Sequence, residues 1–369
     1  MTIPFNLSKF ADYLNASGNA NPLVASDQTN TSTGSLGLPY GTTAQRPASP
    51  AAGYTRINTT TGVVEVYYNN TWNTVYIFPV PVTGTQKAIF GYGNGPTSIT
   101  NLVSNTGIVS TDTTGVGTAR NNIAASTYGT DKAIFGYGFS NIGSESITNL
   151  VSNTGVVATD TTGVGTARYA LAAAGYGTDK AIFGYGTTGT VTAITNLVSN
   201  TGVVATDTTG VGTERWFLAA SGYGTDKAIF GYGRNSSAIS VSVTNLVSNT
   251  GVVATDTTGV GTERYGLTGA KYGTDKAIFG YGRTTVSVSM TNLVSNTGVV
   301  ATDTTGVGTA RYYLSASGYG TDKAIFGYGL ISPATAVTNL VSNTGVVATD
   351  TTGVGTARYG LAAAGYSLT

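Results

Sequence analysis

The sequence predicts an all-β protein: a six-bladed β-propeller with a small N-terminal β or extended attachment region. The string KAIFGYG occurs six times in the chain of 369 residues, at intervals of 45 to 49 residues, a period typical of propeller blades or helix pairs. Gly, Thr and Val dominate each repeat, and no segment carries the 3.6-residue apolar stripe of a helix. A spare copy of one strand segment at the C-terminus indicates a closed ring.

Each repeat supplies four short strand candidates, which we expect to pair as a four-stranded antiparallel blade. In chain order they are the segment after a recurring Arg (for example 171–174), then KAIFGYG, TNLVSN and GVVATDTT. Gly-Thr-Asp between the first two and Asn-Thr-Gly between the last two are tight-turn signals. The recurring arginines are Arg120, Arg168, Arg215, Arg264, Arg311 and Arg358.

The phase of the repeats predicts how the ring closes. The first KAIFGYG string, at Lys87, has no post-arginine segment ahead of it, whereas residues 358–366 supply a spare one. If the C-terminal strand joins the first blade, every blade has four strands and no sheet edge stays open. An open β-solenoid would need capping units instead, and we see none in the C-terminal repeat.

The repeat unit resembles a Kelch repeat. The hydrophobic strand AIFGYG, the connection that follows it and the late Arg stand where the family has a strand ending in a Gly-Gly pair, a connection and an Arg. The resemblance covers residues 87–369 and implies a Kelch-like β-propeller over that range.

Composition excludes several classes of function. The chain has no His and no Cys, so Ser-His-Asp and Cys-His catalysis, disulfides and thiolate metal sites cannot form. Charged residues make up 9% and the net charge is +1, so we expect no nucleic-acid partner. No apolar run is long enough to span a bilayer, and the N-terminus is not a secretory signal. We therefore expect synthesis in a host cytoplasm, no membrane insertion, no cofactor and no metal.

Residues 1–86 lie outside the repeats. Residues 14–50 are rich in small and polar residues and look extended, whereas Val63–Tyr68 and Thr74–Ile77 are predicted strands around an Asn69-Asn70 turn. Within this region, 41–78 resembles a short module recurrent in bacteriophage tail-fibre and related virion proteins. The matching features are Gln45-Arg46-Pro47, Gly53-Tyr54-Thr55-Arg56-Ile57-Asn58, Glu65, Tyr67 and Trp72.

The opening, residues 1–20, also resembles the start of phage structural proteins. These resemblances imply that residues 1–86 attach the protein to other virion proteins, which places it in the virion. The alternative is an N-terminal β-hairpin that packs on the propeller.

The repeats are nearly identical except in two places. One is the segment between KAIFGYG and TNLV, and the other is the pair directly after the Arg. Connections between antiparallel strands alternate between the two faces of a blade, so both places are expected on one face, with the pair around the mouth of the channel. Varied loops on a rigid scaffold commonly bind ligands, and Tyr, Trp, Ser, Asn and Gly are typical of adaptable binding surfaces.

The candidate binding residues are the varied residues best suited to stacking or hydrogen bonding. They are Asn121, Phe139, Tyr169, Trp216, Phe217, Arg234, Tyr265, Arg283, Tyr312, Tyr313 and Tyr359. The alternative is that these loops vary because nothing constrains them.

Charged residues suggest two further sites, both of which we disfavour. Asp179-Lys180, Asp160 and Arg168 have counterparts along the repeats and would give rings around an anion or calcium, but paired charges that lock turns between blades explain them better. Glu214 and Glu263 precede Arg in adjacent blades and are the only enzyme-like feature, because glycosidases need two carboxylates.

The sequence therefore favours a phage tail fibre or similar appendage whose propeller binds a host surface glycan or receptor. A capsid or neck decoration with a purely structural propeller is the alternative, and a polysaccharide-cleaving enzyme is disfavoured. Phage appendages are often trimers, so a homotrimer remains open.

Overall fold

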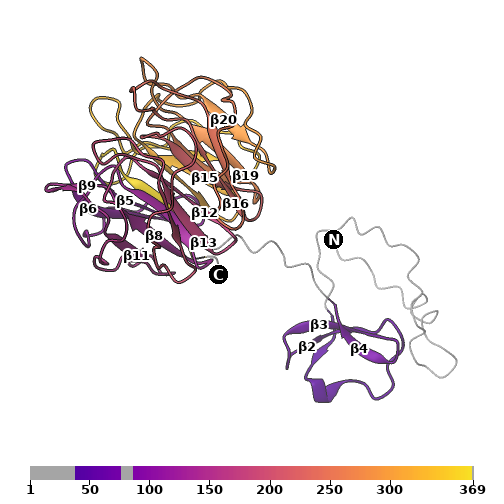
Figure 1. Ribbon diagram of the computed structural model, residues 1–369. Coiled ribbons are helices and arrows are strands. Elements are labelled where there is room, and N and C mark those ends of the chain that lie inside the picture. The colour runs from indigo at the N-terminus through magenta and orange to yellow at the C-terminus, as the bar shows by residue number, and fades with distance from the viewer. Residues whose placement is uncertain (1–37, 76–85, 368–369) are drawn as a thin grey trace, which may run out of the picture. The chain divides into compact units, whose positions relative to one another are not determined.

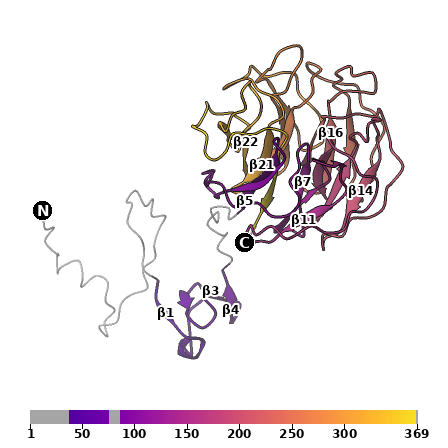
Figure 2. The ribbon, with the colours of Figure 1, turned by 90° about the vertical axis from the view of Figure 1, so that its left-hand side faces the viewer.

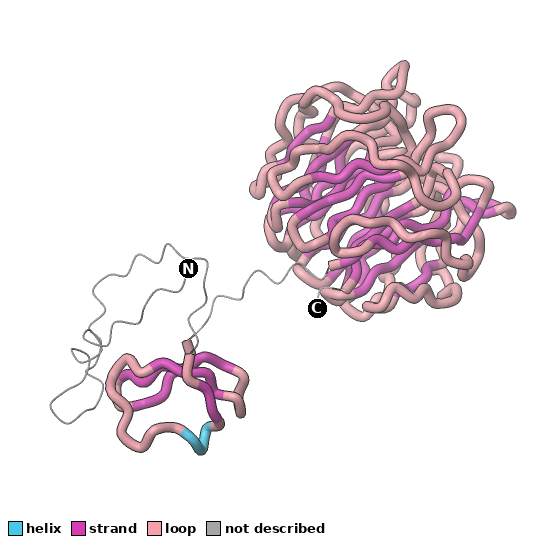
Figure 3. Tube along the Cα trace, turned by 180° about the vertical axis from the view of Figure 1, so that it is seen from behind, coloured by secondary structure: helices cyan, strands magenta, loops and turns pink. Residues whose placement is uncertain are grey.

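The computed structural model describes residues 38–75 and 86–367, and the chain divides into two compact units, Met1–Val80 and Pro81–Thr369. Both units consist of short strands in small sheets (Figure 1). The only helical element in the described ranges is a 3-10 turn, Thr43–Gln45, drawn in cyan in Figure 3. The predicted all-β class with repeated antiparallel sheets is confirmed.

The small unit is one four-stranded sheet. Its order is β1 (Tyr40–Gly41), β2 (Thr55–Asn58), β3 (Val63–Tyr68) and β4 (Thr71–Thr74), with β1 parallel to β2 and the other pairs antiparallel. β3 has the predicted bounds. The strand predicted at Thr74–Ile77 is misplaced: Asn69 and Asn70, at φ 52 and 59, make a two-residue turn that pairs Tyr68 with Thr71 and starts β4 early. Residues 76–77 lie outside the described ranges.

The residues that carry the virion-module resemblance meet in this small sheet. Buried Glu65 accepts hydrogen bonds from Arg46 Nε and Nη2 at 3.1 and 2.6 Å and from Asn58 Nδ2 at 3.0 Å. Hydrogen bonding from Arg46 is the largest cause that holds the pKa of Glu65 below its ordinary value. The Trp72 ring lies 5.5 Å from that of Tyr67, and the Arg46 guanidinium lies 5.7 Å above it. One packed cluster thus joins these residues of the motif.

The large unit repeats one three-stranded antiparallel sheet six times. In each sheet the middle strand is the KAIFG segment: β5 (Lys87–Gly93), β8 (Lys132–Gly136), β13 (Lys180–Gly184), β16 (Lys227–Gly231), β19 (Lys276–Gly280) and β22 (Lys323–Gly327). One neighbour, called here the first strand, is the post-arginine segment: β7 (Ala124–Tyr128), β12 (Ala172–Tyr176), β15 (Ala219–Tyr223), β18 (Thr268–Tyr272), β21 (Ser315–Tyr319) and β24 (Ala362–Tyr366). The other neighbour is the TNLV segment: β6 (Thr97–Val103), β11 (Thr148–Val151), β14 (Thr195–Val198), β17 (Thr244–Val247), β20 (Thr291–Val294) and β23 (Thr338–Val341).

The C-terminal strand completes the sheet that begins the repeats. β24 pairs with β5 from Ala362↔Gly91 to Tyr366↔Lys87, and β5 pairs with β6. The register matches that of the other sheets, where Tyr176 faces Lys180 in the same way. Figure 2 shows β5 beside β21 and β22, and the Phe90 ring of β5 lies 5.2 Å from the Tyr328 ring that follows β22.

The fourth predicted strand of each sheet is not a regular strand. GVVATDTT makes only two isolated bridges to the TNLV strand, for example Val151↔Val157 and Thr148↔Thr161. Two residues lie between the bridge positions on the TNLV strand and three on the opposite segment, so one residue is left over, as in a β-bulge. The Asn149 side chain fills this gap, because its Nδ2 donates to the Ala158 carbonyl and to Asp160 Oδ1.

Adjacent sheets pack through one repeated aromatic pair. The Tyr137 ring lies 5.1 Å from the Phe183 ring of the next sheet, and the same contact recurs from every sheet to its neighbour, the last being Tyr328 on Phe90. The Phe ring takes the space above a strand glycine: a Cβ on Gly136 would lie 2.7 Å from Phe183 Cζ. The first Gly of KAIFGYG, such as Gly136, is therefore required by packing between sheets.

Backbone hydrogen bonds also link each sheet to the next. Gly129 N donates to the Asp179 carbonyl at 2.7 Å, and equivalent bonds run through the other Gly-Thr-Asp turns. The N–H groups of Gly177, Gly224, Gly273, Gly320 and Ser367 donate, in that order, to the carbonyls of Asp226, Asp275, Asp322, Gln86 and Asp131. The last of these bonds returns to the starting sheet. The first strands touch in the same cyclic order, since β24 contacts both β21 and β7.

Candidate binding face

Buried arginines anchor the segment that enters each sheet. Arg168 is fully buried, and it donates to the Tyr185 and Thr166 carbonyls and to Asn196 Oδ1, the last at 2.7 Å. Its guanidinium lies 4.4 Å from the Tyr137 ring of the preceding sheet. The other five recurring arginines are buried in the same manner. Each therefore fixes the direction of the two residues that follow it.

The repeated Asp residues clamp the same entering segment. Asp207 accepts from Thr166 N and Oγ1 and from Asn196 Nδ2, and its Oδ1 lies 4.0 Å from Arg168 Nη1. Burial alone would raise the pKa of Asp207, but the hydrogen bonds and Arg168 together lower it. The corresponding Asp160 binds Thr118, which precedes Arg120, so its basic neighbour is Arg120 and not the Arg168 of its own repeat.

The two varied places of each repeat are hydrogen-bonded to one another. Trp216 N donates to the Arg234 carbonyl, and Arg234 N donates to that of Trp216, both at 2.9 Å. Asn121 and Phe139, Tyr265 and Arg283, and Tyr312 and Leu330 exchange the same pairs of bonds. The varied pair and the varied segment therefore form one face, called here the varied face.

The second residue of each varied pair belongs to a cycle of six backbone hydrogen bonds. Ala170 N donates to the Asn122 carbonyl at 2.9 Å. The N–H groups of Phe217, Gly266, Tyr313, Gly360 and Asn122 donate, in that order, to the carbonyls of Ala170, Phe217, Gly266, Tyr313 and Gly360. All six residues have φ between 48 and 62. Left-handed φ is unfavourable for Phe217 and Tyr313, which have bulky side chains, and such strain is typical of functional sites.

An aromatic cluster covers part of the varied face. It consists of Trp216, Phe217, Tyr265, Tyr312, Tyr313 and Tyr359. Ring centroids lie 4.5 Å apart for Trp216–Phe217 and 4.6 Å apart for both Phe217–Tyr313 and Tyr312–Tyr313, and Tyr359 stacks on Tyr313 at 6.2 Å. Tyr265 contacts Phe217, Tyr312 and Tyr313 at 6.1 to 6.4 Å. The structure thus brings six of the predicted binding residues together.

Two arginines lie on this aromatic cluster. The Arg234 guanidinium is 3.6 Å from the Tyr265 ring centroid, and that of Arg283 is 4.9 Å from the Tyr312 ring centroid. In each case the Arg follows the middle strand of one sheet and the Tyr enters the next sheet. Burial, with Tyr265 and Tyr312 nearby, raises the pKa of Tyr313.

The remaining predicted residues lie apart from the cluster. Phe139, which is 39% exposed, packs edge-on against Tyr169 at 5.0 Å, and neither ring contacts the six clustered aromatics. Asn121 pairs with Phe139 through the backbone. These three residues form a second, smaller group on the varied face.

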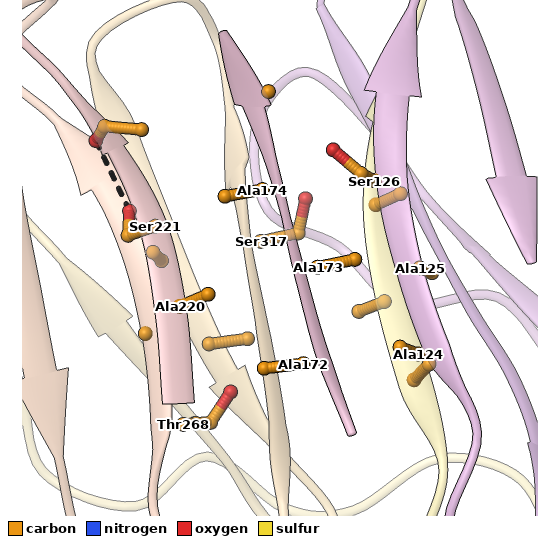
Figure 4. Close-up of a pocket in the computed structure, with 18 of the residues that line it drawn as sticks. Ala124, Ala125, Ser126, Ala172, Ala173, Ala174, Ala220, Ser221, Thr268 and Ser317 are labelled. Carbon is orange, nitrogen blue, oxygen red and sulfur yellow. Dashed lines mark hydrogen bonds between the residues drawn. The ribbon is translucent and has the colours of Figure 1, made fainter. Parts of the chain in front are cut away.

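A cavity of about 380 Å³ opens beside the cluster. Its wall is the small side chains of the first strands, such as Ala124, Ala172 and Ala220, with Ser126, Ser221 and Ser317 (Figure 4). Phe217, Tyr313 and Asn122 line it where the varied pairs meet. Two members of the aromatic cluster, Phe217 and Tyr313, therefore also line the cavity.

Sequence reasoning missed Lys271 and Gln86, which line the cavity near the Gly-Thr-Asp turns. Lys271 stands where other repeats have Gly222 or Gly318, and a Cβ on Gly222 would touch Lys271 Cδ at 3.9 Å. Burial lowers the pKa of Lys271, opposed by Asp275 and Asp226. The charged residue at a position where four of the six repeats have glycine was the signal for Lys271.

The disfavoured charged sites gain no support from geometry. The Asp179 carboxylate pairs with the adjacent Lys180, Oδ1 to Nζ 3.1 Å, and the described residues contain no group of three or more carboxylates placed to hold a metal ion. Glu214 and Glu263 are exposed and do not line the cavity.

Comparison with protein families and with curated proteins finds no match for this chain. Over the residues that the structure describes, no helix is long and apolar enough to cross a membrane.

Proposed function

We propose that the six sheets are blades of a closed six-bladed, Kelch-like β-propeller, with β24 completing the first blade. Support comes from the cyclic order of the first-strand contacts and from the two cycles of backbone hydrogen bonds, one at the Gly-Thr-Asp turns and one at the varied pairs. Each cycle has six members and passes through the junction between the C-terminal strand and the first repeat. In a propeller the cavity between the first strands is the central channel.

We further propose that the protein is a non-catalytic bacteriophage appendage, such as a tail fibre, whose varied face binds a glycan on the host surface. The observation that carries this proposal is the aromatic cluster of the varied face. Aromatic rings bind the apolar faces of sugars, and Tyr and Trp provide large contact area at low entropic cost. The cluster is held in place by a strained backbone and buried arginines, as a preorganised site requires.

Attachment to other virion proteins is assigned to residues 1–86. The described part of this region joins Arg46, Glu65 and Trp72 in one cluster, and these are residues of the tail-fibre-like motif. A capsid or neck decoration would use the same module, so the position on the particle separates the two roles.

The first experiment tests the face. Full-length protein carrying Trp216→Ala, Phe217→Ala, Tyr312→Ala and Tyr313→Ala is compared with a control that carries Tyr40→Ala and Tyr68→Ala, two exposed aromatics of the small unit. We expect binding to host cells and to their isolated surface polysaccharide to fall at least about tenfold in the first variant only. Unchanged binding with intact folding rejects the face, and loss of binding to cells but not to polysaccharide indicates a protein receptor.

The second experiment tests the location. Antibody against residues 87–369 is imaged on purified phage particles that contain the protein. Label at the far end of an appendage supports host binding, label over the capsid or neck supports the decoration role, and absence of label on particles rejects the virion assignment.

A further inference from the structure

Two guanidinium groups on the aromatic cluster have no protein acceptor. Neither Arg234 nor Arg283 forms an ion pair or a side-chain hydrogen bond with any residue of the ranges that the structure describes. The Nε of Arg234 is buried without a hydrogen-bond partner. Burial of an unsatisfied donor is unfavourable, so this position is costly unless an acceptor arrives from elsewhere.

The recurring buried arginines of the same chain, in contrast, donate hydrogen bonds to protein acceptors. Arg264 donates to the Tyr281 and Thr262 carbonyls and to Asn292 Oδ1, and it pairs with Asp303 at 3.8 Å. The other recurring arginines likewise bind an Asn side chain. Every recurring arginine therefore has at least one acceptor for its guanidinium, although the Nε of Arg215 is also buried without a partner, whereas Arg234 and Arg283 donate to no acceptor in the described residues.

The fold does not require an arginine at these two positions. The equivalent residue, directly after the KAIFGYG string, is Thr187 in one repeat, Leu330 in another and Phe139 in a third. Thr187 makes the same pair of backbone hydrogen bonds, with Tyr169, that Arg234 makes with Trp216. The side chain can thus be exchanged without loss of the pairing.

The two cations lie on neighbouring rings of the cluster. Their supporting rings, Tyr265 and Tyr312, have centroids 6.3 Å apart, and both rings contact Tyr313. Burial raises the pKa of Tyr313. Two guanidinium groups therefore lie on neighbouring rings of one aromatic cluster, and Glu214 and Glu263 pair with neither arginine.

We propose that the ligand is an acidic saccharide whose oxyanion, a carboxylate or a phosphate, is bound by Arg234 and Arg283 while its sugar rings stack on the aromatic cluster. Arginine matches both oxyanions through paired N–H donors, and its flat guanidinium remains on the Tyr ring while it donates in its own plane. This inference rests on the proposed function of the varied face and specifies its ligand.

The test uses an array of acidic polysaccharides printed beside matched neutral forms. Polygalacturonate, alginate and hyaluronate are paired with their carboxyl-reduced products, and phosphomannan is paired with its dephosphorylated product. Full-length protein is compared with Arg234→Thr, Arg283→Thr and the double variant, because Thr occupies this position in the repeat of Thr187. Leu330→Thr, at the same position in another repeat and not among the candidate binding residues, is the matched control.

We expect binding to at least one acidic polymer, a loss on reduction or dephosphorylation, and a fall of about tenfold for each arginine removed. The paired arms distinguish a carboxylate ligand from a phosphate ligand. Equal binding to acidic and neutral forms, or arginine variants that bind as the parent does, overturns the inference but leaves glycan binding by the face intact. Failure to bind any acidic polymer also overturns it, and the four-aromatic variant then decides separately whether the face binds the host.

Discussion

The rings of Phe217 and Tyr313 lie 4.6 Å apart although their residues enter sheets that are not neighbours. In the sheet between them, Gly266 holds the equivalent position before the first strand. A Cβ on Gly266 would lie 2.9 Å from Tyr313 Cδ1. The two rings therefore meet over a position that has no side chain. The aromatic cluster depends on this glycine as much as on its aromatic residues.

Gly266→Ala is predicted to disrupt the cluster and to weaken binding by the varied face. The new methyl group would collide with the Tyr313 ring, and the left-handed φ of 62 adds roughly 1 to 2 kcal/mol of strain. We expect a loss of ligand affinity, measured by glycan or cell binding, together with a modest fall in melting temperature.

Gly360→Ala is the matched control for this prediction. Gly360 has the same φ of 62 in the same hydrogen-bond cycle, but its Cβ would meet Asn122, with Oδ1 at 2.8 Å and the backbone N at 3.3 Å, and no aromatic ring of the cluster. The two variants should lose similar stability, and only Gly266→Ala should lose binding. Equal binding losses would mean that strain in the cycle, and not the cluster, controls the ligand.

Replacement of a recurring arginine is predicted to destabilise the large unit strongly. Arg168→Met leaves the Tyr185 carbonyl and Asn196 Oδ1 without their donor in a buried site, at a cost of about 3 kcal/mol. Urea unfolding followed by tryptophan fluorescence measures the loss. Arg234→Met serves as the control, because Arg234 donates no hydrogen bond to the described residues, and it should change the unfolding free energy by less than about 1 kcal/mol. Similar losses in both variants would contradict the structural role assigned to Arg168.

Sequence reasoning predicted the strands of the repeat because their signals are local. The KAIFG and TNLV segments and the two turns appear as expected, and the alternation of connections placed both varied regions on one face. The prediction of a regular fourth strand was wrong. The segment opposite TNLV has one extra residue, and hydrogen bonds from the Asn149 side chain take the place of the missing backbone pairing.

The site was predictable only as a set of residues. Nothing local indicates that Phe217 and Tyr313 adopt left-handed φ, since that conformation is imposed by bonds from neighbouring sheets. The contact across Gly266 joins residues 96 positions apart in the chain, and the pairing of Asp160 with Thr118 crosses from one repeat to another. Such relationships depend on how sheets follow one another in space.

Acid is predicted to weaken the junctions between sheets. The lowered pKa of Asp207 and of its five equivalents means that their carboxylates stabilise the fold above the unfolded pKa, about 3.9, and that this contribution is lost as pH falls through the lower folded value. Melting temperatures should be nearly constant from pH 7 to pH 5 and fall below pH 4. In Asp207→Asn the fall should be smaller, because one clamp no longer titrates. A melting temperature that holds down to pH 2 would show that the clamps add little.

Deletion of residues 358–369 is predicted to expose a sheet edge and to cause aggregation. β5 would lose its partner β24, and the bonds from Arg358 to Asn101 and from Thr356 to Asp112 would be weakened or lost. Size-exclusion chromatography should show oligomers, because an exposed edge pairs with other chains. The control is a rearranged chain in which residues 358–366 are placed before Lys87 through a Gly-Thr-Asp turn, as in the other repeats, and it should be monodisperse again. If the deletion variant is instead as stable and monodisperse as the parent, β24 does not close the ring, and the propeller assignment loses its main support.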